Sequence, residues 1–214
     1  MDKSHYGDRL IQIAAGELPR ARNLKKALVD GADINYQSQQ NGFTALMYVV
    51  SGQYDRIAEY LLYQGANPLL RNDNNQTAKD LVPDHATVLP ILQDFELFFA
   101  AKNNDLKNAK MLIERGASIS FTGPRGYTPL LIAVETNNLL LVEYLLYQGA
   151  DLSQTTVEGK TVFDLASNTE ILKLLKNANL AGMEAAKAFK SSTKNKSNFF
   201  TIPTEPPLLN ESTV

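Results

Sequence analysis

Apolar and polar residues alternate in blocks along this chain, and the pattern is clearest from Gly126 to Asp151. Thr128-Pro129 opens a first apolar block, where threonine can cap free amide groups and proline suits the first helical position. A short polar gap follows, and a second apolar block then runs from Leu139 to Tyr147. Gly149 ends that block, because glycine readily takes the left-handed conformation that closes many helices. The pattern predicts two short antiparallel helices.

The paired blocks are repeated elsewhere in the chain. Glu59–Ala66 and Glu143–Ala150 both read EYLLYQGA, at an offset of 84 residues. The spacing from Gly116 to Gly149, two glycines at the ends of such blocks, is 33 residues. Two short helices cannot bury this much apolar surface by themselves, so we expect the copies to stack on one another.

The period, the T-P-L opening at Thr128 and the Gly-Ala-Asp close at Gly149 together resemble the ankyrin repeat, a motif of about 33 residues. The resemblance covers about residues 8–176. It implies an all-α ankyrin-repeat solenoid of about six helix-turn-helix repeats. The boundaries that follow are an N-terminal lead-in at 1–7, repeats one to three at 8–94, repeats four to six with a C-terminal capping helix at 95–190, and a disordered tail at 191–214.

The regular spacing breaks once, between the third and fourth repeats. Gly65 and Gly116 are 51 residues apart, where two full repeats would need about 66. We therefore expect an irregular region between Pro83 and Phe99 that lacks a complete hairpin. The array then consists of two three-repeat units in tandem, and the third repeat is expected to keep a short second helix containing Pro90.

The composition narrows the range of functions. The net charge of −2 provides no basic field for binding nucleic acid. No apolar run reaches the length of a membrane span, so we expect no membrane insertion. The chain has no cysteine, which excludes cysteine nucleophiles and cysteine metal sites. The first residues lack the apolar core of a secretory signal peptide, and these features together predict a soluble protein of the cytoplasm.

The sequence shows no catalytic or metal-binding constellation. His5 and His85 are far apart in the chain, and there is no glycine-rich phosphate loop. We therefore expect no catalytic residue, no metal ligand and no cofactor. Asp80 and Asp164 occupy matching repeat positions and are expected to form local hydrogen bonds rather than a catalytic pair. Four tyrosines at helical spacing are interpreted as packing residues with hydroxyls in water: Tyr60, Tyr63, Tyr144 and Tyr147.

The resemblance implies a non-catalytic module that binds a partner protein through its concave surface of hairpins and inner helices. The solvent-facing positions of that surface flank the helix openings of repeats two and five. Phe43 and Tyr127 occupy matching positions, and an aromatic residue beside Arg125 is typical of binding hot spots. The alternative, in which each ring packs on its own hairpin, stays open. The expected partner-binding residues are Gln40, Asn41, Phe43, Ser51, Arg125, Tyr127, Glu135 and Thr136.

Two further hypotheses stay open. One is an enzyme or enzyme subunit with a site at the junction of repeats three and four, which a cleft with converging polar groups would favour. The other concerns the tail, where Ser212 and Val214 match the C-terminal pattern of a PDZ ligand, although so short a match also arises by chance. The layout also resembles ankyrin proteins of intracellular bacteria, in which the tail would be a secretion signal and the protein an effector acting on host proteins in the host cytosol.

Overall fold

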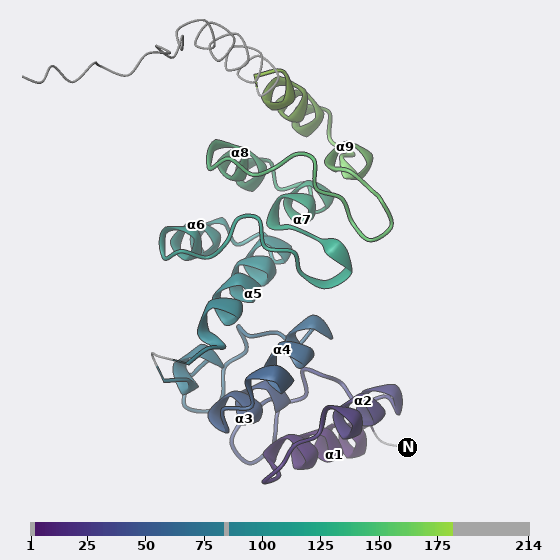
Figure 1. The fold of residues 1–214 in the computed structure, drawn as a ribbon, viewed down its shortest axis with the longest axis vertical. Coiled ribbons are helices and arrows are strands. Elements are labelled where there is room, and N and C mark those ends of the chain that lie inside the picture. The colour runs from purple at the N-terminus through teal and green to yellow at the C-terminus, as the bar shows by residue number, and fades with distance from the viewer. Residues whose placement is uncertain (1–2, 84–85, 182–214) are drawn as a thin grey trace, which may run out of the picture. The chain divides into compact units, whose positions relative to one another are not determined.

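The computed structural model describes residues 3–83 and 86–181, and within these ranges every regular element is a helix (Figure 1). The chain divides into two compact units, Met1–Leu175 and Lys176–Val214, which are taken separately. Two short 3-10 helices, η1 and η2, span Lys79–Leu81 and Pro124–Gly126. The α-helices are α1 Lys3–Ala15, α2 Ala21–Val29, α3 Ala45–Ser51, α4 Asp55–Tyr63, α5 Leu89–Lys102, α6 Leu106–Glu114, α7 Pro129–Glu135, α8 Leu139–Tyr147 and α9 Val162–Leu165.

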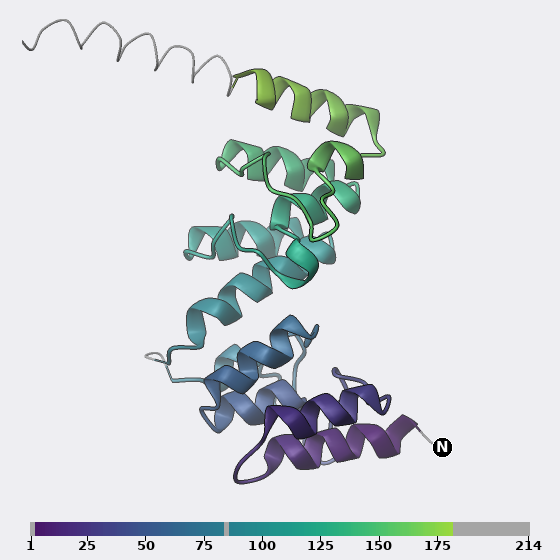
Figure 2. The ribbon, with the colours of Figure 1, turned by 45° about the vertical axis from the view of Figure 1, so that its right-hand side comes forward.

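Consecutive helices of the first unit pack in pairs, and the pairs follow one another in chain order (Figures 1 and 2). The pairs are α1 with α2, α3 with α4, α5 with α6, and α7 with α8. The first helix of a pair also packs on the first helix of the next, as α1 does on α3 and α5 on α7. This arrangement confirms the expected all-α repeat fold for the described residues. Among them, no helix is long and apolar enough to cross a membrane.

The helix starts follow from capping residues in the sequence. The Thr128 hydroxyl accepts a hydrogen bond from the Leu131 amide at 3.3 Å, and Pro129 is the first residue of α7. Thr44 caps α3 in the same way, accepting from the Met47 amide at 3.2 Å. Each cap satisfies an amide that has no partner within its helix. The expected threonine start of these helices is therefore confirmed in both copies.

The helix ends depend on glycine for conformational reasons alone. Gly65 and Gly149 have φ values of 99° and 87°, in the left-handed region. An added Cβ at either position would meet nothing within 4 Å, so open space surrounds both glycines. The backbone angle, and not the available room, therefore selects glycine at these helix ends.

The buried core lies along the first helices of the pairs. In α7 the four residues Leu130, Leu131, Ala133 and Val134 are all buried, and Ile132 joins them. The buried side chains of the whole first unit form one contiguous cluster. Because each helix pair buries its apolar side against its neighbours, no pair has a core of its own, which is the property expected of stacked repeats.

The N-terminal lead-in is shorter than the sequence indicates. We expected residues 1–7 to precede the first repeat, but α1 already begins at Lys3. Tyr6 packs against the core, and an added Cβ at Gly7 would lie 2.3 Å from the Tyr36 ring, so this glycine permits a close contact. The Tyr36 hydroxyl also donates to Asp8 Oδ1 at 2.8 Å. These contacts extend the first helix upstream of the expected start at Asp8.

The junction of repeats three and four is irregular, as expected, although its detail differs from the prediction. The first helix of repeat three is only the three-residue η1, and α5 then runs for 14 residues from Leu89 to Lys102. Pro90 lies in the first turn of α5, where a missing amide does no harm. The expectation of a separate short helix containing Pro90 is therefore wrong, because that helix is continuous with the first helix of repeat four.

The sixth repeat begins with α9 and continues in a helix at residues 169–181. Ile171 and Leu175 of this helix are buried and belong to the core of the first unit. In the second unit, residues 176–181 are helical. The expected capping helix up to residue 190 extends beyond the described residues at position 182, and the expected disordered tail at 191–214 lies wholly outside them.

The two matching aspartates have the local role that the sequence indicates. The Thr77 amide donates to Asp80 Oδ2 at 2.8 Å, and the Thr161 amide donates to Asp164 Oδ2 at 2.8 Å. These bonds lower the pKa of both carboxyls, for Asp80 mainly through the Thr77 amide and for Asp164 mainly through the Thr161 hydroxyl. Each carboxylate therefore closes the start of its own short helix.

Candidate functional site

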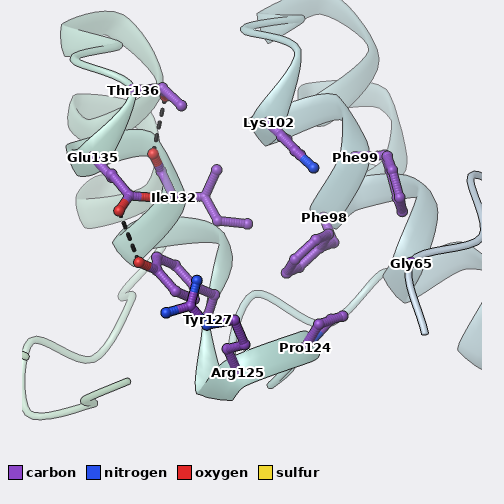
Figure 3. Close-up of a pocket in the computed structure, with 10 residues that line it drawn as sticks. All are labelled: Gly65, Phe98, Phe99, Lys102, Pro124, Arg125, Tyr127, Ile132, Glu135 and Thr136. Atoms are coloured by element: carbon purple, nitrogen blue, oxygen red, sulfur yellow. Dashed lines mark hydrogen bonds between the residues drawn. The ribbon is translucent and has the colours of Figure 1, made fainter. Parts of the chain in front are cut away.

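The second three-repeat unit contains a cavity of about 340 Å³ between α5, the turn η2 and α7, which we name the α5–α7 hollow (Figure 3). Both helices and the turn contribute side chains, and Figure 3 shows them arranged around one space. Four of the expected partner-binding residues belong to this set. The lining residues are Gly65, Phe98, Phe99, Lys102, Pro124, Arg125, Tyr127, Ile132, Glu135 and Thr136.

The turn that carries Arg125 is fixed by the next repeat. Arg125 and Gly126 have φ values of 59° and 78°, so both are left-handed. The Val157 amide donates to the Arg125 carbonyl at 2.9 Å, and a Cβ at Gly126 would lie only 2.8 Å from the Val157 nitrogen. Glycine is therefore required at 126 for its angle and for this close approach. The hydrogen bond holds the turn at the edge of the hollow.

The side chain of Arg125 is held by a charged group of the next repeat. Its Nη2 forms an ion pair with Glu158 Oε1, and Lys160 Nζ lies 3.3 Å from the other oxygen of the same carboxylate. The hydrogen bond from Arg125 is the main cause that lowers the pKa of Glu158. Both partners are largely exposed, so the pair orients the guanidinium at the rim and adds little stability.

Tyr127 and Glu135 form a polar pair on the α7 side of the hollow. The Tyr127 hydroxyl donates to Glu135 Oε1 at 2.7 Å (Figure 3). Burial first, and this bond second, raise the pKa of Tyr127, so the phenol keeps its proton at neutral pH. Thr136 donates from its hydroxyl to the Ile132 carbonyl at 2.9 Å. The hydroxyl of Thr136 is thus used within α7, which leaves its methyl group for contacts in the hollow.

The floor of the hollow is apolar, and its residues were not among those predicted from the sequence. Phe98 and Phe99 of α5 and Ile132 of α7 are all buried. Lys102 is exposed at the rim, and its Nζ lies 5.6 Å from the centre of the Phe99 ring, within reach of a cation–π contact. Lys102 has no salt-bridge partner among the described residues. These residues could have been found by asking which side chains of the preceding inner helix face the T-P-L helix.

The expected residues of the second repeat do not gather in the same way. Gln40 borders a cavity of about 440 Å³ between α1 and α3, and Tyr48 lines it as well. Asn41 donates from its amide to the Tyr48 hydroxyl at 3.0 Å and accepts from the Phe43 amide at 3.0 Å. The Phe43 ring packs on Tyr48, with centroids 5.0 Å apart. Ser51 donates to the Met47 carbonyl at 2.9 Å. Most of these groups are therefore used inside their own repeat.

The tyrosines on the outer helices differ from one another. Tyr63 packs edge-on against Phe95 with ring centroids 5.1 Å apart, which fits the interpretation as a packing residue. Tyr147 occupies the matching position in the second unit and is 86% exposed. The interpretation of Tyr147 as a packing residue is therefore wrong. The sequence around Tyr147 is identical to that around Tyr63 and could not reveal this difference, because the ring that covers Tyr63 comes from a distant part of the chain.

Two carboxyl groups at the junction have raised pKa values because of burial. Asp94 accepts a hydrogen bond from the Ser118 amide at 2.7 Å, and Glu96 lies 3.8 Å from Lys79 Nζ. Each is therefore engaged by a neighbouring structural element. The hollow of about 200 Å³ beside the junction is lined by other residues, namely Gln53, Asp55, Pro83, Ala86 and Thr87. Neither Asp94 nor Glu96 lines this space.

Three of the chain's positions singled out from the sequence lie outside the described residues. They are His85 in the gap at 84–85, and Ser212 and Val214 of the C-terminal motif. His5 lies in α1 and is exposed.

Comparison with known proteins gives two matches to family models. A model of three ankyrin repeats matches residues 97–184, and a model of a single ankyrin repeat matches residues 41–73. Together these matches cover more than half of the chain and include both the α5–α7 hollow and the hairpin of Phe43.

Relatives come from several sources. An ankyrin repeat protein of Rickettsia felis is 34% identical over 101 residues, which are 46% of this chain and 39% of that protein. An ankyrin repeat protein of Acanthamoeba polyphaga mimivirus is 28% identical over 121 residues, 56% of this chain and 74% of that protein. A mitochondrial disaggregase of Bos taurus is 30% identical over 135 residues, 53% of this chain and 20% of that protein. The chain thus spans about two fifths of the Rickettsia relative and about one fifth of the bovine one. With its paired helices, capped starts and glycine ends, the chain belongs to the ankyrin-repeat family, whose arrays are protein–protein interaction modules.

Proposed function

We propose that the protein binds a partner protein through the α5–α7 hollow. The observation that carries this proposal is that Arg125, Tyr127, Glu135 and Thr136 border a single cavity with an apolar floor. Its volume of about 340 Å³ is at the lower end of the range for ligand pockets and suits one large side chain of a partner. An apolar centre with a polar rim is the arrangement that concentrates binding energy in interfaces.

The charges at the rim indicate the chemistry of the partner. Arg125 is already paired with Glu158, and Glu135 accepts from Tyr127. Lys102 is the cation of the hollow that has no ion-pair partner among the described residues. A partner segment with an aromatic or aliphatic residue beside a carboxylate would fill the cavity and pair with Lys102.

The matching residues of the second repeat extend the proposed surface with a smaller contribution. Asn41, Phe43 and Ser51 already form bonds or ring contacts within their own repeat. A partner gains less from a group that has to exchange one bond for another. Gln40, which borders the cavity between α1 and α3, is exposed.

The finer proposal is that the partner is a host protein and that this chain acts as a bacterial effector in the host cytosol. The similarity to the Rickettsia felis protein supports it. A translocation reporter fused to the full chain in an infecting bacterium should produce signal in the host cytosol. A reporter that stays inside the bacterium would remove the effector proposal and leave the binding proposal intact.

The binding proposal is tested by placing a photoreactive phenylalanine analogue at position 127 of the full chain. We expect it to crosslink a partner protein in a lysate of the native or host cell, whereas the same analogue at Leu18 does not. Leu18 is the matched control because it is exposed and lies outside the α5–α7 hollow. Mass spectrometry then identifies the partner for binding measurements with purified proteins.

Calorimetry with that partner then separates the contributions of the hollow. Tyr127→Ala and Lys102→Ala should each weaken binding by about 2 kcal/mol, roughly thirtyfold, whereas Phe43→Ala should weaken it by less than fivefold. Tyr127→Phe keeps the ring and loses only the bond to Glu135, so it should retain most of the affinity. Unchanged circular dichroism would show that the variants are folded. If Phe43→Ala has the larger effect, the principal site is the surface of the second repeat.

A further inference from the structure

The second helices of repeats four and five form a surface that the proposed hollow does not use. Between α6 and α8 lies a groove of about 250 Å³, which we name the outer groove. Leu140 and Tyr147 at its edge are 62% and 86% exposed. Single exposed apolar residues are common, but two on one helix beside a groove form a patch that needs an explanation. The lining residues are Leu106, Lys110, Leu140, Glu143, Tyr144 and Tyr147.

The internal duplication supplies a control for this surface. Helices α4 and α8 share the sequence EYLLY, but the four residues before it are DRIA in α4 and LLLV in α8. The exposed position that is Arg56 in α4 is Leu140 in α8. An arginine there suits contact with water, whereas a leucine does not. Leu61 and Leu145, at the matching core position, are buried in both copies, so the change at Arg56 and Leu140 concerns the surface of the helix.

The two matching tyrosines show what kind of group covers this position. In the first copy, Phe95 and Phe121 lie 5.1 and 6.5 Å from the Tyr63 ring, and Tyr63 is 39% exposed. Both phenylalanines come from the second three-repeat unit, at 95–190. For Tyr147, none of the described residues supplies such a ring contact. The same tyrosine is thus satisfied by aromatic contacts in one copy and presented to solvent in the other.

The outer groove carries one positive and one negative side chain, so its charge pattern is self-complementary. Lys110 of α6 and Glu143 of α8 line the same groove and are 33 residues apart, at the same repeat position. Neither forms a salt bridge within the described part of the chain, and Lys110 Nζ instead lies 4.9 Å above the Tyr144 ring. A surface that carries both signs side by side can pair with a two-fold related copy of itself, because each charge meets the opposite charge of the other chain.

We propose that the outer groove is the interface of a homodimer, in which α8 packs antiparallel on α8 of a second copy of this chain. Leu140 and Tyr147 are seven residues, or about two helical turns, apart. Antiparallel packing therefore sets the Leu140 side chain of each chain against Tyr147 of the other, and Lys110 of each within reach of the other's Glu143. The interface involves two short helices per chain, so the dimer is small and reversible. It leaves the α5–α7 hollow free to bind its partner.

Sedimentation velocity of the full chain over a range of concentrations tests the proposal. The sedimentation coefficient should rise from the monomer to the dimer value as the concentration increases. Leu140→Arg installs the residue that α4 has at this position, so the fold should be kept, and the variant should stay monomeric at every concentration. The matched control is Leu18→Arg, which changes a residue that is 77% exposed outside the groove and should dimerise like the parent chain.

Charge reversal separates this pairing from unspecific apolar association. Lys110→Glu and Glu143→Lys, made singly, should each weaken dimerisation by roughly fivefold or more, and the double variant should recover most of the loss. A parent chain that stays monomeric at the highest concentration would overturn the proposal, as would a Leu140→Arg variant that still dimerises. Failure of the double variant to recover would also overturn it. Binding of the partner at the α5–α7 hollow is a separate measurement, so either proposal can fail alone.

Discussion

The two three-repeat units have the same hairpins but present different groups to solvent. Asn41 and Arg125 occupy matching positions, as do Phe43 and Tyr127. In the first unit the asparagine bonds to Tyr48 and to its own turn, and the phenylalanine packs on Tyr48. In the second unit the arginine is paired with the following repeat, and the tyrosine borders a cavity. The duplicated chain has thus retained its threonine caps and most of its buried positions, while the side chains that could meet a partner have diverged.

The contact between the two three-repeat units provides the strongest test of this comparison. Phe95 is fully buried in α5, and its ring lies 5.1 Å from Tyr63 of the first unit and 4.9 Å from Phe121 of the second. We expect Phe95→Ala to lower the free energy of unfolding by about 3–5 kcal/mol, because it leaves a cavity among aromatic rings. Urea denaturation measures the loss. A change below about 1 kcal/mol would show that the units do not depend on this ring.

The turns of the two units are predicted to be equally sensitive to a methyl group. Gly42 and Gly126 match in the duplication and have φ values of 69° and 78°. A Cβ at Gly42 would lie 2.8 Å from the Asp73 nitrogen, and one at Gly126 lies 2.8 Å from the Val157 nitrogen. Alanine at either position should therefore cost about 1–3 kcal/mol.

Thermal and urea unfolding of the two glycine variants should give losses of similar size. Gly149→Ala is the matched control, because its φ is also left-handed but an added Cβ meets nothing within 4 Å. We expect the control to lose about 1 kcal/mol, from the angle alone. Unequal losses at Gly42 and Gly126 would mean that only one of the two turns is held by the next repeat.

The matching tyrosines should differ in their effect on stability. Tyr63→Ala removes two ring contacts and should cost about 1–2 kcal/mol. Tyr147→Ala removes an exposed side chain, and the free energy of unfolding of the monomer should change by less than about 0.5 kcal/mol. Denaturation has to be measured at low protein concentration, where the proposed dimer has dissociated. Equal losses would show that Tyr147 has a partner within its own chain.

The smallest predicted effect concerns a charge buried at the junction. Within residues 3–83 and 86–181, Glu96 is the charged residue that is buried, with 6% exposure. Lys79 and Asp80 face it from η1, and Arg115 faces it from the end of α6. Burial raises its pKa above the ordinary value of 4.5, against the opposing effect of Lys79. The folded state thus holds a proton that the unfolded state releases, so stability should fall as pH rises from the ordinary pKa through the folded pKa.

Glu96→Gln should abolish this fall, because the amide stays neutral over the whole range. Urea midpoints of the parent and the variant, measured from about pH 4 to about pH 7, should diverge in the variant's favour as pH rises. Glu114→Gln, at an exposed position near the end of α6, is the control and should follow the parent. If the parent gains stability relative to Glu96→Gln as pH rises, the pairing with Lys79 outweighs burial.

The repeats and their caps could be predicted from the sequence because they depend on local chemistry. Thr128-Pro129 and Gly149 act within one turn of the backbone, so their effect does not depend on distant residues. Arg125 and Tyr127 were likewise identified from their place beside a helix start. Their position at the cavity follows from the repeat geometry.

The remainder of the site depends on contacts between distant segments. Phe98, Phe99 and Lys102 line the hollow from α5, a helix that runs from the third repeat into the fourth. A missing hairpin can be recognised from spacing, but the spacing does not indicate which faces of a merged helix are covered. Tyr147 illustrates the same limit, since an octapeptide identical to that of Tyr63 has different neighbours in space.

The merged helix α5 has a consequence for how the protein unfolds. In a regular repeat array each repeat touches only its neighbours, so an array can fray from its ends one repeat at a time. Here one helix of 14 residues runs from the third repeat into the fourth, and it cannot melt at its centre without losing hydrogen bonds on both sides. Amides of α5 should therefore exchange with solvent only when both three-repeat units open together. We therefore expect the two duplicated units to unfold as one cooperative unit.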